Sequence, residues 1–197
     1  MKQFLTYLLS ICLLLSGGVV FSSETMPVNP VQLKNSPTSM EICSTSPIPT
    51  GWIVTDIRIG CAVGSSIYTI EPLNTARRPM SFCHVTPVPA GWVITEVRTQ
   101  CISGVNSYEI TYADQTWPQM DMCNVAGSTV PAGWVVTNMQ TGCAPQGAQR
   151  WTITYANPAL QSMDICNVTS IPVGWIVINS RPGCFQSNGL LTISYVN

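Results

Sequence analysis

Charged side chains are scarce in this sequence. Lys, Arg, Asp and Glu together make up 9% of the 197 residues, and the formal net charge is -1. Proteins that hold nucleic acid or anionic membranes through phosphate groups need clusters of Lys and Arg. The one basic doublet here is Arg77-Arg78. The composition therefore argues against nucleic acid and against an anionic membrane surface as partners.

The residues of common catalytic and metal sites are equally sparse. His84 is the one histidine, so Ser-His-Asp chemistry would depend on it entirely. The acidic residues are thinly spread, and no pair of them indicates a glycosidase couple. The sequence has no CxxC motif, and widely spaced cysteines favour disulfides over a zinc cluster. We expect a non-enzymatic protein with no metal and no cofactor, and we expect His84 to be an exposed strand residue.

Long apolar runs are also missing, apart from a short one at the N-terminus. One Lys near the start precedes a mainly apolar run from Phe4 to Leu15, and small residues follow. This is the layout of a secretory signal peptide, and the run is shorter than the roughly 20 residues of a membrane span. We predict a signal peptide over residues 1–23 and a secreted, periplasmic or cell-surface protein without a membrane span. An uncleaved N-terminal anchor is the alternative.

What the chain does have is a regular series of cysteines and tryptophans. Loss of the signal peptide would remove Cys12 and leave eight of the nine cysteines, an even number suited to disulfides in an exported protein. The eight form four pairs with a period near 40: Cys43 and Cys61, Cys83 and Cys101, Cys123 and Cys143, Cys166 and Cys184. A tryptophan precedes each second cysteine by nine residues: Trp52, Trp92, Trp134 and Trp175.

This periodicity predicts four tandem repeats of about 40 residues. We place them at residues 40–79, 80–119, 120–162 and 163–197, after a flexible N-terminal segment at 24–39. Each repeat has the pattern Met-x-apolar-Cys, a Pro-bearing loop, Gly-Trp and two apolar residues, then a polar turn and a final aromatic-rich run. Alternating apolar residues rich in Val, Ile, Thr, Tyr and Trp indicate β-strands. We predict an all-β fold with about three antiparallel strands in each repeat.

Strict alternation along the strand after each tryptophan predicts which side chains share a face. In the first repeat it places Ile53, Thr55, Ile57, Ile59 and Cys61 on a core face, and Trp52, Val54, Asp56 and Arg58 on the other. The second face would begin apolar and end polar in every repeat.

The Pro-x-Gly-Trp phrase predicts a sharp reversal between two arms of each repeat. Proline stiffens the outgoing arm, glycine permits the bend, and tryptophan anchors the returning strand. In the first repeat, nine residues separate Cys43 from Trp52 and nine more separate Trp52 from Cys61, which brings the two sulfurs level. We predict four bridges within repeats. The rival pairing is Cys61–Cys83, Cys101–Cys123, Cys143–Cys166 and Cys43–Cys184, which would form a ring.

Polar pairs near the tryptophans are the best candidates for a ligand site. Trp supplies a flat apolar surface, and Arg, Asn or a carboxylate supplies hydrogen bonds, a combination that suits a sugar or a peptide. The candidate binding residues are Trp52, Asp56, Arg58, Trp92, Glu96, Arg98, Trp134, Asn138, Gln140, Trp175, Asn179 and Arg181. An ordinary solvated strand face with ion pairs is the alternative interpretation.

Three functions remain compatible with these patterns. The first is a multivalent binding module for a glycan or a cell-surface protein, because four weak sites give avidity toward a repetitive target. The second is a structural envelope or filament-type subunit that self-associates through its edge strands. The third is a protease inhibitor that presents a rigid Pro-x-Pro segment.

Overall fold

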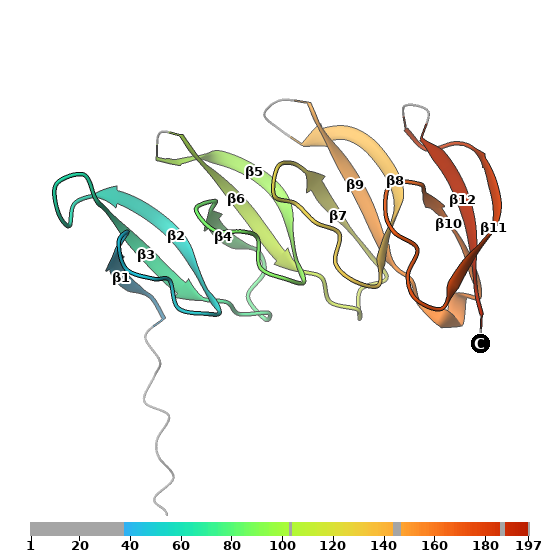
Figure 1. Ribbon diagram of the computed structural model, residues 1–197, viewed down its shortest axis with the longest axis horizontal. Coiled ribbons are helices and arrows are strands. Elements are labelled where there is room, and N and C mark those ends of the chain that lie inside the picture. Colours follow the sequence, from blue (N-terminus) through green and yellow to red (C-terminus); the bar gives the residue numbers. More distant parts are fainter. Residues whose placement is uncertain (1–37, 103, 144–146, 186–187, 197) are drawn as a thin grey trace, which may run out of the picture. The chain divides into compact units, whose positions relative to one another are not determined.

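The computed structural model describes residues 38–197, except 103, 144–146, 186–187 and 197. The predicted signal peptide and nearly all of the predicted N-terminal segment lie outside the described residues. In the described part the fold is all-β, with four antiparallel three-stranded sheets, one in each predicted repeat (Figure 1). A 3-10 turn, η1 (Pro158–Leu160), precedes the first strand of the fourth repeat. The predicted fold class is confirmed.

All four sheets have the same construction. The first and second strands of a repeat both pair with its third strand, which lies in the centre. The first strands are β1 (Met40–Cys43), β4 (Met80–Cys83), β7 (Gln119–Asn124) and β10 (Ser162–Cys166). The second strands are β2 (Trp52–Ile59), β5 (Trp92–Ile102), β8 (Trp134–Cys143) and β11 (Trp175–Pro182). The third strands are β3 (Ser66–Pro72), β6 (Val105–Tyr112), β9 (Ala148–Tyr155) and β12 (Gly189–Tyr195).

The recurring Gly-Trp phrase is a tight turn at the start of each second strand. In the second repeat, Trp92 N–H donates to Pro89 O at 3.1 Å, and Gly91 has a φ of 79°. A type II turn needs positive φ at its third residue, a conformation that glycine adopts without steric cost. The Gly91 carbonyl then accepts from Ala113 N–H at 2.8 Å, just after β6. The other three repeats contain the same two hydrogen bonds, so this turn also ties the corner to the central strand.

A tyrosine at the end of the central strand packs on this corner in three repeats. Tyr112, Tyr155 and Tyr195 lie edge-on to the tryptophans of their own repeats, with ring centroids 5.7–5.9 Å apart. The ring also closes over the turn glycine: a Cβ built on Gly174 would lie 2.7 Å from Tyr195 Cε2. Pro72 pairs with Trp52 at the corresponding place in the first repeat, and a Cβ on Gly51 would meet nothing within 4 Å.

This difference predicts unequal effects of alanine at the two corners. Gly51→Ala should lower the free energy of unfolding by about 1 to 2 kcal/mol, the cost of a left-handed residue with a Cβ. Gly174→Ala should cost roughly a further 1 to 3 kcal/mol because the added methyl displaces the Tyr195 ring. Urea denaturation of the two variants measures both values. Equal losses would contradict the packing role of the tyrosine.

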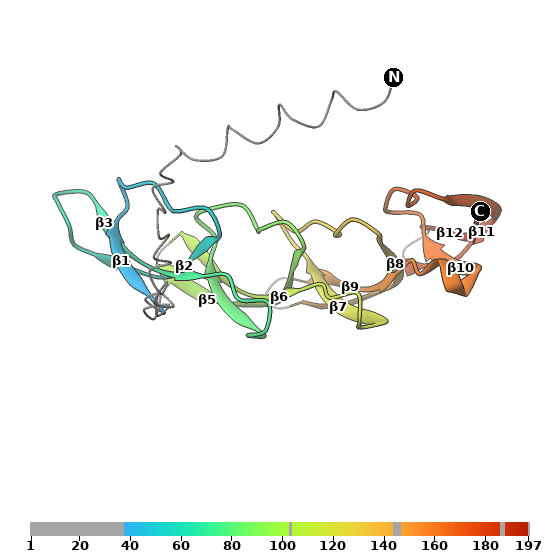
Figure 2. The same cartoon turned by 90° about the horizontal axis from the view of Figure 1, so that it is seen from below.

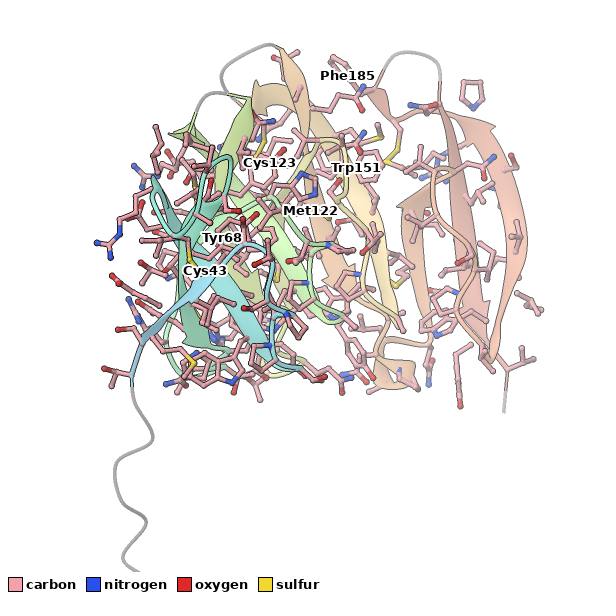
Figure 3. All side chains as sticks on the ribbon, turned by 60° about the vertical axis from the view of Figure 1, so that its left-hand side comes forward. Cys43, Tyr68, Met122, Cys123, Trp151 and Phe185 are labelled. Atoms are coloured by element: carbon pink, nitrogen blue, oxygen red, sulfur yellow. A yellow bond between two sulfur atoms is a disulfide. The ribbon has the colours of Figure 1, made fainter. Side chains whose placement is uncertain are left out.

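The four disulfides lie within repeats: Cys43–Cys61, Cys83–Cys101, Cys123–Cys143 and Cys166–Cys184. The predicted pairing is therefore confirmed, and the ring-forming pairing is wrong. Each bridge joins a cysteine at the end of the first strand to a cysteine nine residues after the tryptophan that begins the second strand. The bridge therefore closes the loop that contains the Pro-bearing corner. Figure 3 draws the bridges as yellow bonds, with Cys43 and Cys123 labelled.

Removal of these bridges should cost different amounts in different repeats. Both sulfurs of Cys123–Cys143 are buried, whereas Cys61 in the first repeat is exposed. The double variant Cys123→Ala, Cys143→Ala should lose about 3 kcal/mol from loop closure and more from the buried space it leaves. The matched variant Cys43→Ala, Cys61→Ala should lose mainly the loop-closure contribution. Chemical denaturation of both variants checks the order, and a larger loss in the first repeat would contradict it.

The predicted division of side chains between the two faces of the second strand holds for Trp52, Ile53 and Val54 and is wrong beyond them. A β-bulge interrupts every second strand at the third residue after the tryptophan, at Thr55, Thr95, Thr137 and Ile178. In the first repeat Val54 pairs with Ile70, and the next paired residue is Asp56, opposite Thr69. Because one residue is inserted, the alternation reverses beyond the bulge. Ile57 therefore joins Trp52 and Val54 on one face.

Asp56 and Arg58 consequently lie on the face opposite to Trp52. The pairing of Asp56 with Thr69 and of Ile57 with Tyr68 fixes this division, which all four repeats share. Ile59, expected on the core face, is 88% exposed. The face that carries the tryptophan, called here the tryptophan face, is the core face of each sheet. The opposite face carries the charged pairs beyond the bulge and is called the polar face. Before the bulge, the residues on that side are buried against the next repeat: Ile53, Val93 and Val135.

The loop between the first and second strands covers the tryptophan face of its own sheet. Figure 2 shows these loops raised above the sheets. The apolar residue before the turn proline packs against the buried cluster in each repeat: Ile48, Val88, Val130 and Ile171. The loop thus works as a small second layer, so a three-stranded sheet has an enclosed core on one side.

Consecutive repeats pack through their edge strands. β2 lies against β4, β5 against β7, and β8 against β10, although within the described ranges no backbone ladder joins one sheet to the next. One buried cluster contains Ile53 of the first repeat with Met80 and Phe82 of the second, and another contains Cys83 with Val54 of the first. In the third interface, Phe185 packs against the cluster that contains Met122; both are labelled in Figure 3. The core is therefore continuous across repeat boundaries.

Candidate functional site

The two halves of the predicted ligand site lie on opposite faces of each sheet. Trp92, Trp134 and Trp175 are buried, with at most 6% of their surface exposed, and Trp52 is half-buried. Their indole rings are enclosed by the covering loop and, in three repeats, by a tyrosine. The predicted combination of tryptophan with polar pairs therefore does not form. The tryptophans are corner and core residues.

The eight polar candidates are all exposed on the polar face: Asp56, Arg58, Glu96, Arg98, Asn138, Gln140, Asn179 and Arg181. The structure brings them together with residues of the other two strands that the sequence pattern did not select. In the fourth repeat Asn179 lies opposite Thr192, which lies opposite Asp164. We call this three-strand line, together with the arginine or glutamine two residues along the second strand, a polar row.

Each of the four sheets carries a polar row at the same position. The residues in register across the three strands are Glu41, Thr69 and Asp56; Ser81, Glu109 and Glu96; Asp121, Thr152 and Asn138; and Asp164, Thr192 and Asn179. The sequence does contain a signal for the acidic residues of the first strands, which were not among the predicted site residues. Three of the four Met-x-apolar-Cys motifs have a carboxylate in second place, and in a strand this residue faces away from the Met.

Within the rows, arginine is paired with carboxylate. Arg181 donates to Asp164 at 2.6 Å, Arg98 to Glu109 at 2.5 Å, and Arg58 forms an ion pair with Glu41. In the third repeat the arginine comes from the central strand, where Arg150 lies 3.9 Å from Asp121. Exposed pairs of this kind add little to stability. Their effect is to present hydrogen-bonding groups with little net charge.

Asp164 shows the local electrostatics of a row. The Thr192 hydroxyl donates to its carboxylate at 2.6 Å, and the Arg181 guanidinium donates to the second oxygen. The Thr192 hydrogen bond, followed by the contribution of Arg181, lowers the pKa of Asp164 below its ordinary value. The carboxylate is therefore ionised at neutral pH and is held in one orientation.

A shallow hollow lies beside the third row. It has a volume of about 380 Å³, and its lining includes Arg78, Trp117, Asp121 and Arg150. Trp117 is 41% exposed, so its indole ring offers an accessible apolar surface. The Arg78 guanidinium lies 4.5 Å from the centre of its ring and covers part of it. No member of this set was predicted, because Trp117 stands outside the repeat pattern.

Arg78 and Asp114 lie beside this hollow, each in a spacer, the segment between the last strand of one repeat and the first strand of the next: residues 73–79 and 113–118. Arg78 Nη2 donates to Asp114 at 2.8 Å and Arg78 Nε donates to Thr75 O at 2.8 Å. The Arg78 hydrogen bond and the Thr116 N–H lower the pKa of Asp114 from 3.8 to about 2. The ion pair fixes the guanidinium over the Trp117 ring.

The lowered pKa predicts a specific acid titration. The stabilisation from ionised Asp114 is complete above its ordinary pKa of 3.8 and is lost as the pH falls toward about 2. An NMR titration of the carboxyl group should give a pKa near 2, and Arg78→Gln should raise it toward 3.8. Arg77→Gln is the control, because Arg77 pairs with Glu71. An unchanged pKa in Arg78→Gln would contradict this assignment.

His84 is not the exposed strand residue that was expected. It follows β4, is half-buried, and its ring centroid lies 5.2 Å from that of Tyr108. A Cβ on Gly127 of the third repeat would lie 2.7 Å from His84 Nε2, so the imidazole packs at a repeat interface. Across the described ranges, His, Cys, Asp and Glu side chains form no group of three or more that could hold a metal ion.

Comparison with protein-family models, curated proteins and solved structures finds no match to this chain. Over the residues that the structure covers, no helix has the length and apolar character needed to cross a membrane. The four disulfides are typical of oxidising compartments outside the cytoplasm.

Proposed function

We propose that this chain is a secreted or periplasmic, non-enzymatic binding protein whose target is a cell-surface glycan with little charge. The observation that carries the proposal is the third polar row, which continues into the hollow beside the exposed Trp117. Carboxylate, guanidinium and an accessible indole are thus gathered on one surface. The other three rows repeat the polar part of this arrangement.

The chemistry of the hollow favours a sugar over a polyanion. Asp121 and Arg150 are both partly exposed, and their charges oppose each other. Arg78 is neutralised by Asp114. A sugar ring can place its C–H face on the indole while its hydroxyls donate to the carboxylate and accept from the guanidinium. A phosphate-rich ligand would gain little from a surface where each arginine already has an acidic partner.

Repetition of the rows supports multivalent attachment. A single shallow hollow binds weakly, but several weak contacts to a repetitive target combine into useful avidity. The loops that carry the Pro-x-Pro segments pack against their own sheets through Ile48 and Val88. This packing gives no support to the alternative of a protease inhibitor, which needs a freely presented segment.

A glycan array with the mature, disulfide-bonded protein tests the proposal. Wild type should give reproducible signals, and Trp117→Ala should weaken the strongest of them at least about tenfold, which corresponds to about 1.4 kcal/mol. Leu160→Ala is the matched control, since Leu160 is an exposed apolar residue in another spacer. Absence of wild-type signal, or equal binding by Trp117→Ala and wild type, would refute the proposal.

A further inference from the structure

The last strand of the array exposes residues that every other second strand buries. Ile176 and Val177 of β11 are 49% and 45% exposed. The residues at the same two positions after the tryptophan in the other repeats are fully buried, each at 0%: Ile53 and Val54, Val93 and Ile94, Val135 and Val136. In those repeats the first strand of the following repeat lies against the second strand. β11 presents the same apolar surface without that cover among the described residues.

The bulge residue makes this edge more apolar than the internal ones. Thr55, Thr95 and Thr137 stand at the bulges of β2, β5 and β8, and each hydroxyl lies 3.3–3.4 Å from a carbonyl oxygen of the central strand. At the same position β11 carries Ile178, which is 57% exposed. Terminal repeats that face water usually carry a polar outer surface. Three consecutive exposed apolar residues on β11 are the opposite of such a cap.

The first strand of the array presents the complementary half of the interface. Met40 of β1 is 39% exposed, whereas Met80 and Met120 at the same position are 2% and 9% exposed and Met163 is half-buried. Ile42 and Cys43 are only half-buried, although Phe82 and Cys83 at the same positions are fully enclosed. The enclosed residues are covered by the preceding repeat, as the shared clusters show.

We infer that these two edges bind each other between copies of the chain, so that β11 of one molecule packs against β1 of the next. The occupant is a second copy because one chain carries both halves of an interface that it already forms three times internally, between β2 and β4, β5 and β7, and β8 and β10. The contact is heterologous, and it generates open chains or closed rings of molecules. This inference is independent of the glycan proposal.

The internal interfaces indicate how the two copies meet. Ile53 shares a buried cluster with Met80 and Phe82, so Ile176 should pack on Met40 and Ile42 of the second copy. Val54 shares a cluster with Cys83, so Val177 should pack on Cys43 of the second copy. Among the residues that the structure describes, no backbone ladder joins the sheets of neighbouring repeats. Side-chain packing, and not strand addition, therefore holds the copies together.

Sedimentation velocity of the mature, oxidised protein at rising concentration tests the inference. Wild type should associate as the concentration rises. Ile178→Lys should remain a monomer, because it places a charge in the apolar contact. Val173→Lys is the matched control: Val173 lies in the same repeat, is fully exposed, and stands outside β11. It should associate like wild type.

A mixing experiment distinguishes head-to-tail contact from other modes. Met40→Lys blocks the first edge and Ile178→Lys blocks the last, so each variant alone should stay a monomer. Mixed together, they should form 1:1 dimers and nothing larger. Met40→Lys keeps a free last edge and Ile178→Lys keeps a free first edge, so each molecule can make one contact. Circular dichroism checks that both variants are folded. Ile178→Thr is a milder change, because it introduces the residue found at the internal bulges, and it should weaken association.

Several outcomes would overturn the inference. Wild type that stays monomeric at the highest concentration removes it, as does association of Ile178→Lys equal to that of wild type. Dimers of Met40→Lys alone would show contact between two last edges, which is a different, symmetric interface. Loss of association in the Val173→Lys control would show that the effect is one of charge and not of the edge.

Discussion

The structure depends on one constraint: the loop between the first and second strands is folded back over its own sheet and held there by a disulfide. A three-stranded sheet of this length has too little apolar surface to enclose a core alone. The Gly-Trp turn supplies the reversal, the cystine closes the loop, and the apolar residue before the turn proline covers the tryptophan face. The surfaces that this arrangement leaves uncovered are the ones available for binding.

Two kinds of surface remain, and they account for the two proposals. Beyond the bulge the polar face is left to solvent, and it carries acid, hydroxyl and arginine groups on all four sheets. The sheet edges are apolar and are covered by the next repeat wherever one exists. A ligand is expected on the first surface and a further copy of the chain on the second. The two activities are compatible, because association through the edges multiplies the number of polar rows.

Repeat number, strand content and cysteine pairing were predictable from the sequence, because each depends on spacing that recurs four times. The composition of the candidate site was not. Strict alternation placed Asp56 beside Trp52, whereas the bulge at Thr55 moves Asp56 to the opposite face. Three threonines at the same distance after tryptophan were a visible hint, since each hydroxyl bonds to the neighbouring strand. Trp117 was not predicted because it occurs in a single spacer and so has no counterpart in the other repeats. The exposure of Ile178 depends on which strand covers β11, which the sequence pattern does not show.

Non-reducing peptide mass mapping of the mature protein shows whether each covering loop is closed over its own sheet. We expect four cross-linked peptide pairs, each from a single repeat: Cys43 with Cys61, Cys83 with Cys101, Cys123 with Cys143, and Cys166 with Cys184. Bridges between repeats, or free thiols in the folded protein, would contradict it, because the covering loops would then not be closed over their own sheets.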